Sequence, residues 1–156
     1  MTADEIIRLV TSMPGAVAVT ASEAGGAPES AWGDTFFFHD PDGDEANRRM
    51  PFATLVITDY DGFDTASNLN RPDVFRLNIG VGRELFTELI GHSPAAHAAH
   101  QADYDYAALD RVLPHPVYAS QSWVCVLNPG AASSARARAL LSEAHRRARE
   151  RHQRRS

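Results

Sequence analysis

The sequence predicts a single α+β domain built on one antiparallel β-sheet of about five strands, with helices packed on one face. The strand patterns cluster in the first part of the chain instead of alternating with helices, which favours an antiparallel sheet. Residues 74–81 alternate strictly, with apolar side chains on one side and Arg76 and Asn78 on the other. Apolar stripes of helical spacing begin and end the chain.

A helix is expected at the N-terminus, because Thr2 and Glu5 have capping-box spacing ahead of an apolar stripe. Pro14 and Gly15 end this helix. Runs of β-branched and aromatic residues bounded by turn residues then predict the strands. These strands are expected at residues 16–21, 33–40, 52–59, 74–81 and 122–128.

Helical patterns follow the central strand. Gly91 is a natural end for the first of them, and Pro114 ends the second. Residues 92–103 are rich in Ala and His and give no firm expectation. The helices are expected at 83–90, at 104–113, and from Ser133 or Ser134 onward. Residues 1–152 are predicted to form the domain and residues 153–156 a frayed C-terminal end.

Composition favours a cytoplasmic bacterial protein. A chain of 156 residues can bury a core without disulfides, and a single cysteine agrees with a reducing compartment. No apolar run reaches the ~20 residues that span a bilayer, and the acidic N-terminus does not resemble a signal peptide. All 15 basic residues are Arg, which is typical of a GC-rich bacterial genome.

Charge is unevenly distributed along the chain. Residues 136–156 hold eight Arg and two Glu, whereas the whole chain has a net charge of −5. A basic C-terminal helix on an acidic body is compatible with nucleic-acid binding, but also with cations placed near a helix C-terminus. Nucleic acid is therefore a possible partner that is not favoured. Its contacts would come from the arginines of the last helix: Arg136, Arg138, Arg146, Arg147, Arg149 and Arg151.

The motifs that would indicate catalysis or a cofactor are incomplete. His92, His97 and His100 lie in a segment without further metal ligands, so an exposed loop is expected and no metal. Cys125 lies in an apolar strand, where a thiol is usually inert. Gly80-Val-Gly82 lacks the third glycine of a dinucleotide fingerprint. We therefore expect no cofactor and favour a non-catalytic role. A metal-dependent hydrolase using His39, Asp59 or His115 is the last alternative.

A polar set attached to the sheet is the candidate ligand site. If the strands that carry them are neighbours, these side chains would line one concavity. The alternative is that Arg76 pairs with an acidic neighbour and Asn128 caps a turn. The predicted ligand-binding residues are Arg76, Asn78, His115, Tyr118, Trp123 and Asn128.

Three stretches carry a resemblance to a known family: Phe75–Val81, His115-Pro-Val-Tyr118 and Ser122–Pro129. They resemble a bacterial family of uncharacterised domains, number 6194 among the domains of unknown function. The strand around Trp123 and the closing helix are distantly similar to MmcQ/YjbR-like proteins, small α+β domains for which DNA binding has been suggested. The resemblance supports the fold and supplies no catalytic residues. The expected function is a binding module for an unknown small molecule or protein, as a monomer or homodimer.

Overall fold

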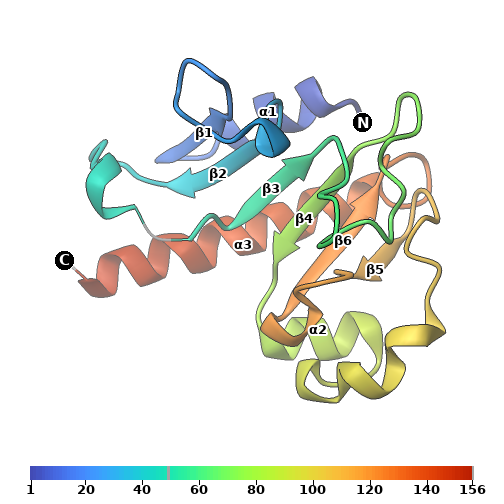
Figure 1. The fold of residues 1–156 in the computed structure, drawn as a ribbon. Coiled ribbons are helices and arrows are strands. Elements are labelled where there is room, and N and C mark those ends of the chain that lie inside the picture. The colour runs from blue at the N-terminus through green and yellow to red at the C-terminus, as the bar shows by residue number, and fades with distance from the viewer. Residues whose placement is uncertain (49, 156) are drawn as a thin grey trace.

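The computed structural model describes residues 1–48 and 50–155 and contains one open antiparallel sheet (Figure 1). Its strand order is β1-β2-β3-β4-β6-β5, and each neighbouring pair is antiparallel. The α+β class and the single antiparallel sheet are confirmed, with six strands where about five were expected. The strands are β1 Ala16–Thr20, β2 Thr35–His39, β3 Ala53–Val56, β4 Arg76–Gly80, β5 Val112–Pro114 and β6 Trp123–Leu127.

The helix predicted at residues 104–113 is absent, and the sixth strand, β5, begins inside that segment, so the prediction was wrong. Asp110 adopts a left-handed backbone conformation with φ of 56°, which a continuing helix does not allow. Its carboxylate instead accepts the backbone N–H groups of Gly130 and Ser133, where α3 begins. Val112 and Leu113 then pair with β6 at the sheet edge, where the missing N–H of Pro114 is tolerated.

Three α-helices are found within the described residues. The capping box of Thr2 and Glu5 is confirmed at α1, and Gly91 closes α2 with φ of 95°. The last helix begins at Ser134, as expected. The helices are α1 Ala3–Thr11, α2 Arg83–Ile90 and α3 Ser134–Arg155, and short 3₁₀ helices are η1 Glu29–Ala31, η2 Glu45–Asn47, η3 Pro94–Asp103 and η4 Ala119–Gln121.

The alternation of β4 divides the protein into two faces. Leu77 and Ile79 are fully buried in the main core, which includes Ile6 of α1 and Leu141 of α3. In Figure 1, α1 and α3 lie behind the sheet on this side. Side chains at alternate positions of β4, beginning with Arg76, therefore point to the face opposite these helices.

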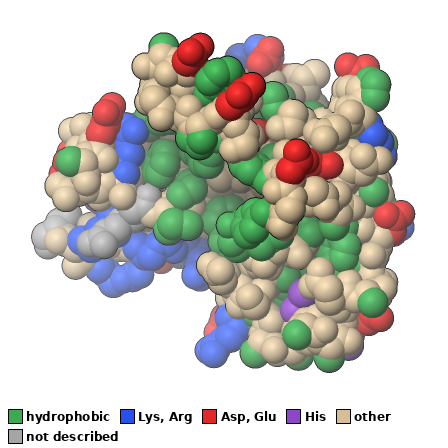
Figure 2. All heavy atoms as spheres, in the orientation of Figure 1, with side chains coloured by type: hydrophobic (Ala, Val, Ile, Leu, Met, Phe, Trp, Pro, Cys, Tyr) green, Lys and Arg blue, Asp and Glu red, His purple; other side chains and the backbone are tan. Residues whose placement is uncertain are grey.

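The second face is only partly covered. The long connection between β3 and β4 places Leu69 against Cys125 and Leu127 of β6, forming a smaller apolar cluster. Over β2, β3 and β4 the surface is hollowed, and hydrophobic side chains line the hollow in Figure 2.

Candidate ligand-binding site

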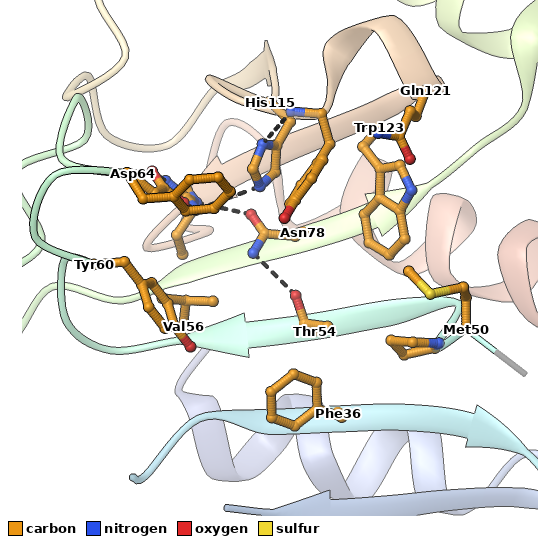
Figure 3. A pocket seen from close by; sticks show the side chains of 14 residues that line it. Phe36, Met50, Thr54, Val56, Tyr60, Asp64, Asn78, His115, Gln121 and Trp123 are labelled. Atoms are coloured by element: carbon orange, nitrogen blue, oxygen red, sulfur yellow. Dashed lines mark hydrogen bonds and ion pairs between the residues drawn. The ribbon is translucent and has the colours of Figure 1, made fainter. Parts of the chain in front are cut away.

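A cavity of about 360 Å³ occupies this hollow. Figure 3 shows Trp123, Gln121 and Met50 at one end, Tyr60 and Val56 at the other, and Asn78 and Thr54 between them. Its walls are mostly aromatic or apolar, and its floor is polar. The apolar walls come from Phe36, Met50, Pro51, Val56, Phe63 and Trp123, with the rings of Tyr60 and Tyr118, and the polar floor from Thr54, Asp64, Arg76, Asn78 and His115.

Arg76 forms the centre of the floor and is completely buried. Its guanidinium makes two bonds to the Asp64 carboxylate, at 3.0 Å from Nη1 and 2.5 Å from Nη2. Nη1 also donates to Ser67 Oγ at 2.9 Å, and Nε donates to Asn78 Oδ1 at 2.8 Å. A bidentate pair of this kind neutralises the charge, so the floor presents polar groups without a net charge.

His115 has a defined tautomer in this arrangement. Its Nδ1 accepts the backbone N–H groups of Val117 at 3.0 Å and Tyr118 at 2.9 Å, so Nδ1 cannot carry a proton. Burial, followed by the charge of Arg76, lowers the pKa of His115 to about 3, and the ring is neutral. The single proton therefore lies on Nε2.

This Nε2–H group has no acceptor among the described residues. Nε2 lies 3.4 Å from Nη2 of Arg76, which is itself a donor and cannot accept a hydrogen bond. The ring is 2% exposed and lines the cavity. An unsatisfied buried donor costs about 1–3 kcal/mol, and a ligand that supplies an acceptor would recover it.

Asn78 and Thr54 extend the donor character of the floor. Asn78 Oδ1 is occupied by Arg76, and its Nδ2 donates one hydrogen to Thr54 Oγ1 at 3.0 Å. Among the described residues, no acceptor is found for the second amide hydrogen of Asn78 or for the hydroxyl hydrogen of Thr54, so both can donate to a ligand. The cavity therefore suits a molecule with hydrogen-bond acceptors, such as carbonyl oxygens or ring nitrogens, between apolar faces.

Five of the six predicted ligand-binding residues line this cavity: Arg76, Asn78, His115, Tyr118 and Trp123. They meet because β4 pairs with β6, with Asn78 opposite Cys125 and Gly80 opposite Trp123. Arg76 also pairs with an acidic residue, as the alternative interpretation expected, and that residue is Asp64.

Asn128 is not among the described residues that line the cavity. It clamps the chain ahead of β4, where its Oδ1 accepts the N–H of Phe75 and its Nδ2 donates to the carbonyl of Asp73. These contacts agree with the alternative interpretation, in which Asn128 caps a turn. It lies just after β6 with φ of 44°, a conformation that asparagine tolerates better than most residues.

Replacing Asn128 with Ala is expected to lower the free energy of unfolding by about 2 kcal/mol, from two lost hydrogen bonds and left-handed strain. Asn128→Gly should cost less, because glycine removes the strain and only the bonds are lost. Urea denaturation of both variants measures the difference. Equal losses would show that backbone strain contributes nothing at this position.

The sequence did not identify several residues of the site. Asp64 and Ser67 lie in the connection between β3 and β4, where the acidic and polar composition indicated only turns. Thr54 could have been predicted, because pairing of β3 with β4 places it opposite Asn78 on the same face of the sheet. Tyr60 is held through its hydroxyl, which donates to the buried carboxylate of Asp34.

The arginines proposed for nucleic-acid contact do not form one surface. Arg146 is paired with Glu143 and with Glu150 on α3. Arg147 and Arg151 line a groove that adjoins the cavity. Arg136, Arg138 and Arg149 are exposed elsewhere on the helix.

The three residues of the hydrolase alternative lie in different surroundings. The His39 ring packs against His145 of α3, with 5.5 Å between ring centroids, on the helix-covered face. Asp59 accepts the N–H of Leu69, and His115 lies at the cavity floor on the other face. These residues therefore share no common site.

The histidine-rich segment is more ordered than expected. It forms the 3₁₀ helix η3, and the prediction of an exposed loop was wrong for His97, which is 3% exposed. His97 contacts the hydroxyl of Tyr106, and its Nδ1 lies 3.0 Å from Nε2 of His92. Within the described part of the chain, no three His, Cys, Asp or Glu residues are grouped as a metal ion requires.

The fold and the cavity together define an α+β protein with one face of its sheet covered by helices and a ligand-sized pocket on the other. A family model described as "Family of unknown function (DUF6194)" matches residues 1–156, and the chain belongs to this family. No curated protein and no solved structure matches the chain. Over the residues that the structure describes, no helix combines the length and apolarity needed to cross a membrane.

Proposed function

We propose that this protein binds a small planar molecule that carries a hydrogen-bond acceptor, and that it holds this ligand without reacting with it. The observation that carries the proposal is the Nε2–H of His115, a buried donor without a described acceptor at the floor of an aromatic-walled cavity. Trp123 and Tyr118 supply ring faces on which a planar molecule can stack.

The same geometry argues against acid–base or nucleophilic chemistry at the floor. A histidine that acts as a general base needs a free nitrogen lone pair at the substrate, and the one lone pair of His115 is used by two backbone N–H groups. Asp64 is committed to Arg76. Cys125 is fully buried, and this burial raises the pKa of its thiol to about 12.

Tryptophan fluorescence tests the proposal, because the chain has only two Trp residues and one of them lines the cavity. The probes are small planar amides such as 1-naphthamide, whose carbonyl can accept the His115 proton. In the Trp32→Phe variant, where Trp123 remains, the probe should change the emission in a saturable way. In the matched Trp123→Phe variant the emission of Trp32 should not change.

A second variant tests the donor itself. His115→Asn retains an acceptor for the two backbone N–H groups but removes the imidazole Nε2–H, so binding of 1-naphthamide should weaken about tenfold, the value of one hydrogen bond to a ligand acceptor. Unchanged affinity would contradict the assigned role of His115. Absence of saturable binding by every planar amide, in a protein that remains folded by circular dichroism, would contradict the proposed function.

Other features expected from the sequence remain part of this proposal. They are an MmcQ/YjbR-like sheet, a bacterial cytoplasmic location and a monomeric or homodimeric state. The resemblance around Trp123, the Arg-only basic composition and the single cysteine support them. A protein partner in place of a small molecule is the alternative, and capture of the amides in the cavity would favour the small molecule.

A further inference from the structure

A second hollow adjoins the cavity and is rich in arginine. It has a volume of about 630 Å³ and shares four lining residues with the cavity: Met50, Pro51, Gln121 and Trp123. Its remaining walls include Arg83 at the start of α2 and three arginines of α3: Arg147, Arg151 and Arg155. No acidic residue is among the described residues that line it. In Figure 2, Arg side chains gather along the lower edge of the central hollow.

The segment Gly80–Gly82 brings an aromatic ring and a guanidinium side by side. A Cβ atom added to Gly80 would lie 3.2 Å from the Trp123 indole, and one added to Gly82 would lie 2.5 Å from Cζ of Arg147. The two side chains thus occupy the space above glycines two positions apart, about 7 Å along an extended chain. Glycine is favoured at position 82 by its φ of 85° and at position 80 by the tight Trp123 contact, although the segment is not a dinucleotide fingerprint.

The arginines of this groove lack the acidic partners that Arg146 has on the same helix. Arg146 contacts two glutamates, whereas no ion pair is found for Arg147, Arg151 or Arg155 within the described residues. Arg147, Arg151 and Arg155 are successive i, i+4 neighbours on one side of the helix. Partial burial and then repulsion from neighbouring arginines lower the pKa of Arg151. A cluster of like charges is stabilised by a bound anion.

We propose that the ligand is an organic phosphate with a planar aromatic head group, of the nucleotide class. The inference rests on the proposed function, because the head group is the planar molecule of the cavity. Its ring stacks on Trp123 and accepts the His115 Nε2–H through a ring nitrogen or carbonyl. Its phosphate lies against Arg147 and Arg151 in the adjoining groove. Free nucleotides and single-stranded nucleic acid share this chemistry.

Adenosine 5′-monophosphate and adenosine form the decisive pair of probes, because they differ only in the phosphate. Binding is measured by the Trp123 emission of the Trp32→Phe protein at low and moderate salt. The monophosphate should bind about tenfold or more tightly than adenosine, with an advantage that falls as salt rises. Arg147→Gln/Arg151→Gln should reduce its affinity to that of adenosine and leave adenosine binding unchanged.

The matched control is Arg136→Gln/Arg138→Gln, which removes the same charge from exposed positions of the same helix. This variant should bind the monophosphate as the parent protein does. A short single-stranded oligoadenylate is the probe that distinguishes a free nucleotide from single-stranded nucleic acid as the ligand. Much tighter binding of the oligomer, with a steep salt dependence, would identify nucleic acid as the source, and equal affinity per site would identify the free nucleotide.

Three results would overturn the inference. The first is equal affinity for adenosine and its monophosphate, and the second is an equal loss in both arginine double variants. The third is binding of 1-naphthamide without binding of either adenine compound, which would leave the proposed function standing. If neither the amides nor the adenine compounds bind, the proposed function fails together with this inference.

Discussion

Replacing Asp64 with Asn is expected to lower the free energy of unfolding by about 3–5 kcal/mol, because it leaves the Arg76 guanidinium buried without a counter-charge. Arg76 is fully buried and Asp64 is 5% exposed, so water cannot replace the lost carboxylate. For a domain of this size the thermal midpoint should fall by roughly 10 °C. Urea denaturation and thermal melting followed by circular dichroism measure the two quantities.

The control is Asp61→Asn, an exposed carboxylate in the same connection between β3 and β4, which should change stability by less than about 0.5 kcal/mol. The double variant Arg76→Met/Asp64→Leu should recover most of the loss, since an apolar pair of similar volume removes the unpaired charge. Similar stability of the two Asn variants would show that other groups neutralise Arg76. Arg76→Ala alone would leave Asp64 buried and unpaired. This variant should therefore destabilise the fold, and a loss of binding in it would not report on the ligand site alone.

Acidification from pH 7.5 to pH 4 is expected to remove about 3 kcal/mol of stability through His115 alone. The unfolded chain has an ordinary histidine pKa of 6.5, whereas burial and the charge of Arg76 lower the folded value to about 3. Below pH 6.5 the unfolded state therefore binds a proton that the folded state excludes. The contribution of His115 is complete above pH 6.5 and is lost as the pH falls toward 3.

Other groups also titrate between pH 7.5 and pH 4. The contribution of His115 is therefore the difference between the stability that the parent loses and the stability that a His115 variant loses. The pKa values of His39 and His97 are lowered by burial, and that of Asp34 is raised by burial. His115→Asn should therefore lose about 3 kcal/mol less than the parent between the two pH values, in urea titrations at each pH. Parallel pH profiles for the parent and His115→Asn would show that the ring is protonated in the folded protein.

The strand pattern in the sequence was sufficient to predict the two faces of the sheet. Alternation at residues 74–81 separates Leu77 and Ile79, which enter the helix-covered core, from Arg76 and Asn78. This period-two pattern is local, and a shift of one residue would put the whole apolar set in solvent. The helix ends at Thr2 and Gly91 were predictable for the same reason, since these two caps depend on a few neighbouring residues.

Local patterns did not predict the structure of residues 104–113. Their apolar spacing fits a helix, but Asp110 is used across 20 or more residues to hold Gly130 and Ser133 ahead of α3. A hydrogen bond to a distant backbone outweighs a weak local helix propensity. Local patterns contain no information about that distant partner, so β5 became visible only in the folded protein.

Local patterns in the sequence were enough to predict the α+β class and the polar side of the central strand, and five of the six residues predicted for a ligand site line the pocket. The contacts that those residues make became known only from the folded protein. The partner of Arg76, the proton position on His115 and the position of Arg147 over Gly82 depend on contacts between distant segments. Local periodicity fixes the direction of a side chain along its own element, whereas its charge state and free hydrogen-bonding groups depend on what the rest of the chain brings to it.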